Sequence, residues 1–312
     1  MKKPLIILTG PTAVGKTKLS ISLAQAVNGA IISADSMQVY RHMDIGSAKI
    51  RPEEMCGVPH YLIDVLDPSE EFHVVKFVEL AHEAMEKIYA AGQIPIVTGG
   101  TGFYIQALLK EVDFTESHGE LPIRKQLEEK AATEEGAAEL YRELSEVDPA
   151  SAETIHPNNV KRVIRALEYY HETGQKISEH NEEQKQKESP YCSAYFVLND
   201  ERSILYDRID RRVDQMICDG LVDEVFRLKE MGYTRDLVSM QGLGYKELFP
   251  YLAGECTLEE AVYIIKRDTR HFAKRQLTWF RREKDVIWLN KPDFAYDEEK
   301  ILSYMLDCWN ET

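Results

Sequence analysis

Short apolar runs separated by helix-forming segments set the pattern of this chain. Five runs have the length and composition of strands, at residues 5–9, 30–33, 94–98, 194–198 and 286–289. Between them, apolar residues recur at helical spacing, as Leu19, Leu23 and Val27 do after the first run. Strands that alternate with helices in this way are typical of a mostly parallel sheet flanked by helices. The pattern therefore predicts an α/β fold.

One stretch departs from this alternation. Residues 116–191 are Glu-rich and helix-forming, contain no good strand, and close with the polar sequence HNEEQKQKESP. We interpret the stretch as a helical insertion. A chain of 312 residues is long enough for one large and one smaller domain. We therefore expect an α/β core formed by residues 1–115 and 192–312, and an insertion domain formed by residues 116–191.

The loop after the first run has the sequence GPTAVGKT, residues 10–17, and matches the motif GxxxxGK[ST]. It joins a predicted strand to a predicted helix, so its backbone N–H groups and the helix N-terminus would point at bound phosphates. Lys16 adds a positive charge, and the Thr17 hydroxyl can ligate Mg²⁺. The loop alone does not distinguish a nucleoside triphosphate from another diphosphate ester.

Two further loops, ADSMQVY at 34–40 and TGGTGFY at 98–104, also follow predicted strands. Ligands bind at the carboxyl ends of parallel strands, so we expect the three loops to converge on one cleft. Asp35 is placed to act as a general base or Mg²⁺ partner, or simply to cap a turn. Thr101 offers a hydroxyl to an ester oxygen, or is an ordinary turn residue.

Two arginines and one missing acid bear on the chemistry of this cleft. Arg208 and Arg212 stand four apart on a predicted helix, where they could clamp a diphosphate or pair with nearby acids such as Asp207. The strand IPIVT ends in threonine and not in the acidic residue of many ATP hydrolases, which leaves Asp64 as a weak substitute.

Charge is distributed unevenly along the chain. The net charge is −15, which disfavours a polyanionic partner, and residues 116–148 hold ten acidic residues against four Lys or Arg. Residues 266–284, however, hold eight Lys or Arg against two acids, with aromatic residues interleaved. On a helix Lys266, Arg270 and Lys274 would share one face. Such a segment suits nucleic acid, although a solvated helix face has the same composition.

The cysteines and the apolar runs indicate the cellular compartment in which the protein works. The five cysteines show no CxxC spacing, and no apolar run approaches the length that spans a membrane. The first apolar run also ends too early for a signal peptide. We therefore expect reduced thiols, a cytoplasmic protein and no membrane contact.

Seven ordered blocks together resemble the bacterial tRNA dimethylallyltransferase (tRNA isopentenyltransferase) family. They are GPTAVGKT, DSMQVYRHMDIGSAK, VPHYLIDVLDP, GGTGFYIQALL, HPNNVKRVIRALE, QGLGYKE and KRQLTWFR, and the resemblance runs from residue 4 to about residue 290. It implies a P-loop NTPase-like core. It also implies transfer of a dimethylallyl group from dimethylallyl diphosphate to N6 of adenosine 37 in tRNA, with Mg²⁺ and release of diphosphate.

The resemblance also implies roles for individual residues. Asp35 would be the catalytic base, Thr101 would contact the departing oxygen, and Lys16 with Arg208 would stabilise the leaving diphosphate. Thr17 would be the metal ligand. The implied diphosphate-binding residues are Gly10, Pro11, Thr12, Ala13, Val14, Gly15, Lys16, Thr17 and Arg212.

The implied RNA partner is the anticodon stem-loop of tRNA, which the insertion domain would also contact. The implied tRNA-binding residues are Asp35, Ser36, Met37, Gln38, Thr101, Arg124, Lys161, Arg162, Arg165, Gln241, Gly244, Tyr245, Lys246, Lys274, Arg275, Gln276 and Arg281. We expect a monomer. Two alternatives stay open: an adenylate isopentenyltransferase that acts on free nucleotides, and a P-loop kinase that uses ATP to phosphorylate a small metabolite.

Overall fold

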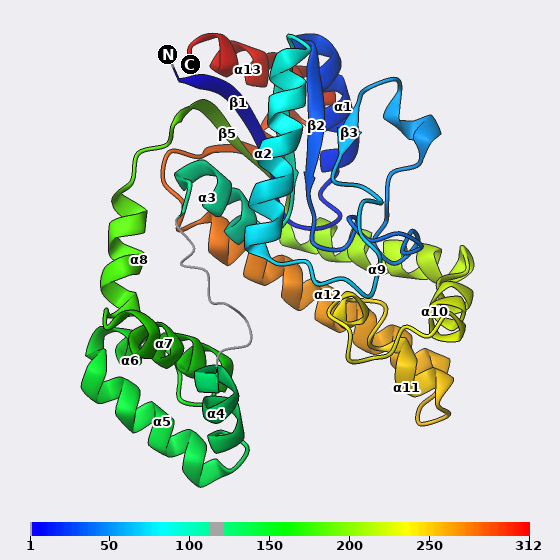
Figure 1. Ribbon diagram of the computed structural model, residues 1–312. Helices are drawn as coiled ribbons and strands as arrows, with labels where there is room; N and C mark the ends of the chain where they lie inside the picture. Colours follow the sequence, from blue (N-terminus) through cyan, green and yellow to red (C-terminus); the bar gives the residue numbers. More distant parts are fainter. Residues whose placement is uncertain (1, 113–121) are drawn as a thin grey trace. The chain divides into compact units, whose positions relative to one another are not determined.

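The computed structural model describes residues 2–112 and 122–312 (Figure 1). Contacts divide the chain into two compact units: unit 1 is Met1–Leu109 with Pro190–Thr312, and unit 2 is Lys110–Ser189. The sequence pattern placed these divisions at residues 116 and 191. No helix in the described part of the chain is long and apolar enough to cross a membrane.

Unit 1 is built on a six-stranded sheet in the order β3-β2-β4-β1-β5-β6, and all its pairings are parallel. The five predicted strands are present, whereas the short β3 was not predicted. At the carboxyl ends Thr9 lies opposite both Gly99 and Val197, so the loops that follow these strands leave the sheet at one edge. The strands are β1 Lys3–Thr9, β2 Gly29–Ala34, β3 His60–Tyr61, β4 Ile94–Gly99, β5 Tyr191–Asn199 and β6 Ile287–Asn290.

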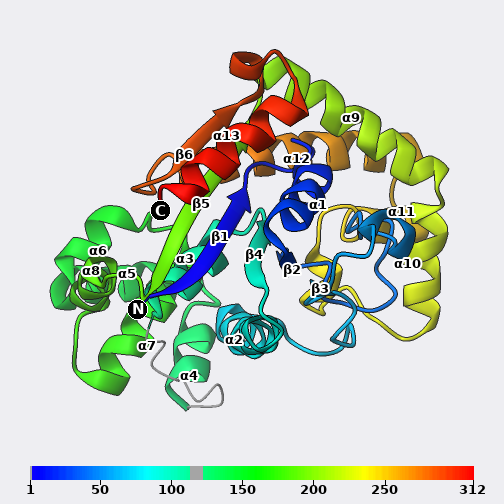
Figure 2. The same cartoon turned by 90° about the horizontal axis from the view of Figure 1, so that it is seen from above.

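Helices cover both faces of this sheet, which explains why its central strands are apolar on both sides. Successive residues of a strand point to opposite faces, so Leu5 and Ile7 join one core cluster while Ile6 and Leu8 join the other. The first cluster includes α2 (Val74–Ala90) and α3 (Gly102–Lys110). The second includes α1 (Lys16–Val27) and α13 (Glu298–Asn310), and Figure 2 shows α1 and α2 on opposite sides of the strands.

Four more helices complete unit 1: α9 (Arg202–Cys218), α10 (Leu221–Glu230), α11 (Leu248–Leu252) and α12 (Leu258–Phe280). The two longest, α9 and α12, run side by side (Figure 1). Ion pairs join them at Lys266–Asp214 (2.6 Å) and Arg270–Asp210 (2.5 Å). Short 3₁₀ turns lie at Pro52–Met55, Ser239–Gln241 and Lys291–Phe294.

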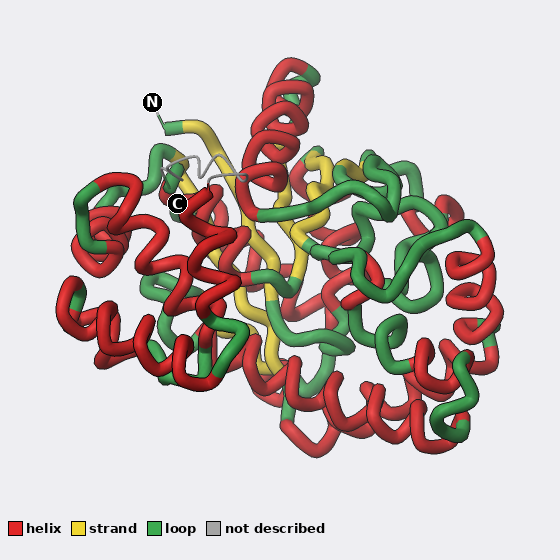
Figure 3. Tube along the Cα trace, turned by 60° about the horizontal axis from the view of Figure 1, so that its bottom comes forward, coloured by secondary structure: helices red, strands yellow, loops and turns green. Residues whose placement is uncertain are grey.

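In its described part unit 2 consists of helices only, and the strands in Figure 3 all belong to unit 1. Its small core includes Leu140, Leu144 and Leu167. Buried Asp148 joins two of its helices, because its carboxylate accepts hydrogen bonds from the backbone and hydroxyl groups of Ser151 and Ser178. The helices are α4 Pro122–Lys130, α5 Glu134–Val147, α6 Pro149–Thr154, α7 Val160–Thr173 and α8 Ile177–Gln186.

Candidate active site

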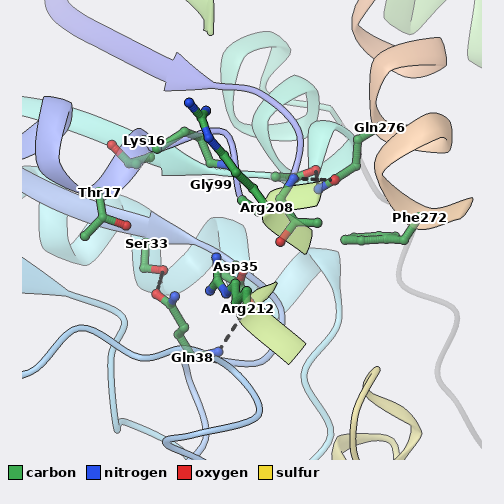
Figure 4. A pocket seen from close by; sticks show the side chains of 15 residues that line it. Lys16, Thr17, Ser33, Asp35, Gln38, Gly99, Arg208, Arg212, Phe272 and Gln276 are labelled. Carbon is green, nitrogen blue, oxygen red and sulfur yellow. Dashed lines mark hydrogen bonds between the residues drawn. The ribbon is translucent and has the colours of Figure 1, made fainter. Parts of the chain in front are cut away.

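A pocket of about 340 Å³ lies in unit 1 at the carboxyl ends of β2 and β4, beside the loop that follows β1. This volume is in the range of small-molecule sites. All three predicted loops contribute residues to this pocket, and α9 and α12 supply the remaining wall (Figure 4). The lining residues are Thr12, Ala13, Gly15, Lys16, Thr17, Ser33, Asp35, Gln38, Thr98, Gly99, Gly100, Arg208, Arg212, Phe272 and Gln276.

The P-loop, residues 10–17, bends tightly between β1 and α1. Gly10 and Gly15 have φ angles of 147° and 101°, a region that favours glycine. A Cβ on Gly10 would stand 2.2 Å from the Leu198 carbonyl oxygen, so only glycine fits beside β5. The Lys16 ammonium folds back over the loop and donates to the carbonyl oxygens of Gly10 (2.9 Å) and Pro11 (2.8 Å).

The electrostatics of the pocket favour an anion. Burial, and after it the positive charge of nearby Arg212, lower the pKa of Lys16 to about 7, while Asp35 acts in the opposite direction. Burial also lowers the pKa of Arg212, again opposed by Asp35. Two cationic groups are thus held in a poorly solvated space with a single carboxylate nearby. A bound polyanion would relieve their mutual repulsion.

Asp35 directly follows β2, as predicted. Its Oδ1 accepts hydrogen bonds from the backbone N–H groups of Met37 (2.8 Å) and Gln38 (3.4 Å), so the carboxylate does cap a turn. Its Oδ2 makes no hydrogen bond with the part of the protein that the structure describes. One oxygen therefore fixes the group while the other is available for a proton or a metal ion.

Ser33, Gln38 and Thr98 add polar groups to the floor of the pocket. The Ser33 hydroxyl donates to Gln38 Oε1 (3.0 Å), and Gln38 Nε2 reaches the carbonyl oxygens of Ser47 and Ala48 (both 3.4 Å). Ser33 and Thr98 are direct partners across β2 and β4. Neither was predicted from the sequence, although hydroxyl residues near the ends of two predicted strands were a usable signal.

Arg208 has a partner that was not predicted from the sequence. Its Nη1 donates to Oδ2 of buried Asp200 at 2.7 Å, just after β5, while Asp207 pairs with Arg211. This pairing holds the guanidinium at the pocket wall. Arg212 lies beside Asp35 (Figure 4).

Thr101 and Asp64 lie apart from the lining described above. Among the described lining residues the TGGTGFY loop contributes Thr98, Gly99 and Gly100 but not Thr101. The Thr101 carbonyl accepts the N–H groups of Tyr104 and Ile105 in the first turn of α3. Asp64 binds the Lys49 ammonium (2.5 Å), which also contacts Asp44. Asp64 is thus engaged in an ion pair and does not substitute for a metal-binding acid here.

Oxygen donors in the pocket match what Mg²⁺ requires, since this ion takes oxygen ligands and retains several waters. Thr17 and Asp35 line the same pocket. The Thr98 hydroxyl is buried and finds no hydrogen-bond partner in the described structure, so it would offer one more polar oxygen to a ligand bound in the pocket. No cluster of three or more His, Cys, Asp or Glu able to hold a metal occurs in the described residues.

Apart from those in the loops at 34–40 and 98–104, the predicted RNA-binding residues of unit 1 fall into two groups. Lys274, Arg275 and Arg281, at the end of α12, are exposed. Gln241 is exposed and donates to the Arg235 carbonyl, Lys246 is half-buried beside Glu247, and the Gly244 N–H donates to the same Glu247.

The structure corrects the predicted role of two side chains in that set and of one helix face. Tyr245 is completely buried, and its hydroxyl donates to Glu224 (2.7 Å), so its side chain is not available to RNA. Gln276 is also buried, with both amide atoms bonded to the protein. Lys266 and Arg270 do share a side of α12, but that side faces the acids of α9 and is not an open basic face.

The predicted RNA-binding residues of unit 2 lie on α4 and α7. Lys161 and Arg162 are exposed. Arg124 and Arg165 both contact the carboxylate of Glu168, at 3.4 Å and 2.9 Å, and the Glu168 side chain is 1% exposed. A single buried carboxylate therefore orients two arginines whose side chains are 42% and 35% exposed.

Comparison with known proteins decides the family. The family model for IPP transferase matches residues 38–283, and the model for isopentenyl transferase matches residues 3–71. The tRNA dimethylallyltransferase of Lachnoclostridium phytofermentans is 65% identical over 309 residues, covering 99% of this chain and 98% of that protein. The chain belongs to the IPP transferase family of tRNA dimethylallyltransferases.

Solved structures of family members share the fold. The full-length tRNA isopentenylpyrophosphate transferase from Bacillus halodurans is 45% identical, with a TM-score of 0.74 and coverage of 99% of this chain and 98% of that one. A eukaryotic dimethylallyltransferase, solved in crystallographic snapshots of its action on tRNA, is 35% identical, with a TM-score of 0.80. It is matched over 94% of this chain and 75% of that chain. The predicted α/β fold with a parallel sheet and the predicted family are confirmed.

Proposed function

We propose that this protein transfers a dimethylallyl group from dimethylallyl diphosphate to N6 of adenosine 37 in tRNA and releases diphosphate. Membership of the tRNA dimethylallyltransferase family supports the reaction class. The single observation that carries the proposal is that an anion-binding P-loop and the carboxylate of Asp35 line one pocket. An alkyl transfer from a diphosphate to an amine needs both: a grip on the leaving group and a base for the amine proton.

The donor's diphosphate would lie against the P-loop, within reach of residues 10–17 and Arg212. Lys16 and Arg208 would compensate the negative charge that grows on the leaving group as its bond to carbon breaks. When bound, Mg²⁺ supplies a further positive charge at the diphosphate oxygens, with the Thr17 hydroxyl as its protein ligand. We also propose that Thr101, which lies just beyond the end of β4, contacts the departing oxygen.

Asp35 would act on the nucleophile. The adenine amine is a weak nucleophile because its lone pair is delocalised into the ring. As N6 forms a bond to C1 of the dimethylallyl group, the C1–O bond to the diphosphate breaks and an N6 proton passes to Asp35 Oδ2. A positioned base of this kind typically contributes about 10² to 10⁴ in rate. The Oδ1 hydrogen bonds to Met37 and Gln38 would keep the carboxylate aimed during the transfer.

The target base has to leave its stack in the anticodon loop, at a cost of a few kcal/mol. Contacts elsewhere on the RNA must offset that cost. In unit 1 we assign this role to Ser36, Met37 and Gln38 beside the pocket, to the backbone around Gly244, to Gln241 and Lys246, and to exposed Lys274, Arg275 and Arg281. In unit 2 we assign it to Arg124, Lys161, Arg162 and Arg165.

A labelling experiment separates this proposal from its two alternatives. The protein is offered dimethylallyl diphosphate labelled in the prenyl group, with unmodified tRNA or with AMP, and separately ATP labelled at the γ-phosphate. Label that enters tRNA alone supports the proposal. Label that enters AMP would identify an adenylate isopentenyltransferase, and label that leaves ATP would identify a kinase.

The proposal also covers the cellular compartment and the oligomeric state. Five cysteines lie free in the structure, which fits a reducing compartment such as the cytoplasm. We propose that the protein acts there as a monomer. Sedimentation of the purified chain alone and with one anticodon stem-loop tests the oligomeric state.

A further inference from the structure

Gln276 ties α12 to the two backbone segments that border the pocket. Its Oε1 accepts the backbone N–H of Thr12 in the P-loop, and its Nε2 donates to the Gly100 carbonyl beyond β4, both at 2.9 Å (Figure 4). The side chain is 5% exposed. Both ends of the amide are therefore used inside the protein, and each bond spans two segments that are distant in sequence.

The glycines of the TGGTGFY loop show how closely α12 approaches. A Cβ on Gly100 would stand 2.1 Å from Gln276 Nε2, and a Cβ on Gly102 would stand 2.2 Å from Trp279 Cδ1. Neither glycine has a positive φ. These positions are thus glycine because the helix needs the space, and not because the backbone requires a conformation that only glycine adopts.

The Gln276 amide completes the support of the P-loop. From inside the loop, the Lys16 ammonium binds the Gly10 and Pro11 carbonyls, and from outside Gln276 holds the next N–H, at Thr12. This part of the loop is therefore fixed before any ligand binds. Lys274 and Arg275, by contrast, are exposed on the same helix. The helix has an inward residue that serves the pocket and outward residues that suit RNA.

We propose that Gln276 is a positioning residue of the diphosphate site and not a contact for RNA. Its amide holds the P-loop and the end of β4 at a fixed separation, so that the anion meets a preformed site. The assignment rests on the proposed function only in naming the anion as the donor's diphosphate. It predicts that removal of the amide weakens anion binding and leaves RNA binding intact.

Three variants and one control test the proposal. Gln276→Met removes both hydrogen bonds but keeps the length of the side chain. Gln276→Glu keeps an acceptor for Thr12, loses the donor to Gly100 and brings a negative charge toward the anion. Gly100→Ala disturbs the same contact from the other side. Thr278→Ala is the control, because Thr278 is exposed and its hydroxyl bonds only to the Lys274 carbonyl of its own helix.

Calorimetric titration with inorganic pyrophosphate and Mg²⁺, without RNA, gives the anion affinity, and fluorescence anisotropy gives the affinity for an anticodon stem-loop. We expect Gln276→Met and Gly100→Ala to weaken pyrophosphate binding about tenfold, the effect of about one net hydrogen bond, and Gln276→Glu to weaken it more. RNA affinity should stay within about twofold of the wild type. The KM for dimethylallyl diphosphate should rise more than kcat falls.

Opposite results would overturn the assignment. If Gln276→Met weakens stem-loop binding and leaves pyrophosphate binding unchanged, Gln276 is an RNA contact. If only the melting temperature falls, its role is structural. A wild-type protein that binds pyrophosphate but prenylates no tRNA would refute the proposed function, and the titrations would still decide the role of Gln276.

Discussion

The Lys16 ammonium changes charge near neutral pH, because burial lowers its pKa to about 7. A bound diphosphate would stabilise the charged form and raise that pKa again, so binding takes up a proton. Below about pH 7 Lys16 is already charged, and the contribution of Lys16 to the affinity is fully present. Above that pH the affinity falls, by at most about tenfold per unit, until the pH passes the raised pKa of the complex.

This residue-scale prediction is checked by titrating pyrophosphate between about pH 6 and 9, in buffers of different ionisation enthalpy that report proton uptake. Because pyrophosphate itself titrates in this range, Lys16→Met is the control. The wild type should lose affinity with pH more steeply than the variant. Equal slopes, or no excess proton uptake in the wild type, would mean that Lys16 stays charged throughout.

Asp35→Asn separates the two roles of this side chain. The asparagine Oδ1 can still accept from the Met37 N–H, so the turn and the binding of both substrates should persist. The base is removed, and single-turnover prenylation should slow by about 10² to 10⁴. Rapid quench with prelabelled donor measures the rate. A variant that reacts at nearly the wild-type rate would remove Asp35 from the base role.

At the scale of elements, the sequence predicted what is encoded locally. The apolar runs indicated five of six strands, and the glycine and lysine spacing placed the P-loop, whereas β3 has only two residues and leaves no periodic signal.

Contacts between distant segments were not predictable. Gln276 and Thr12 are 264 residues apart, and only the packing of α12 brings them together. Lys266 and Arg270 were misassigned because Asp214 and Asp210, also four apart, face them from α9.

The loop that carries Gln38 depends on a carboxylate from another element. Buried Glu224 on α10 accepts the N–H groups of Asp44, Ile45 and Gly46 at 2.8–3.1 Å, and the Tyr245 hydroxyl at 2.7 Å. Glu224→Gln replaces one acceptor oxygen by a donor, so at least one of these partly buried N–H groups loses its partner. We expect the free energy of unfolding to drop by about 1–3 kcal/mol.

Urea denaturation measures this change, and Glu230→Gln, at an exposed position on the same helix, is the matched control. The KM for tRNA should also rise in Glu224→Gln, because the same loop supplies the Ser47 and Ala48 carbonyls that orient Gln38. Equal stability of the two variants would show that the loop holds its shape without Glu224.

At the scale of the whole molecule, a protein with a net charge of −15 has to attract a polyanion. Screening limits the reach of each charge to about 10 Å at ordinary salt, so local clusters count for more than the total. On α12 the cations nearer the middle are neutralised by α9, which leaves Lys274, Arg275 and Arg281 exposed. Replacing these three by alanine should weaken tRNA binding and flatten its salt dependence, by about 0.7–0.9 in the logarithmic slope for each phosphate that the protein no longer neutralises.

A charge-matched variant decides between local and global electrostatics. Unit 1 has three other exposed cations on α2 and α10, namely Lys87, Arg227 and Lys229. We assign none of them to RNA binding. Their triple alanine variant lowers the net charge by the same amount. If the local cluster binds RNA, only the α12 variant changes affinity and slope in filter binding at several salt concentrations. If the overall field governs the encounter, the two variants weaken binding alike, and the assignment of the α12 cations to RNA fails.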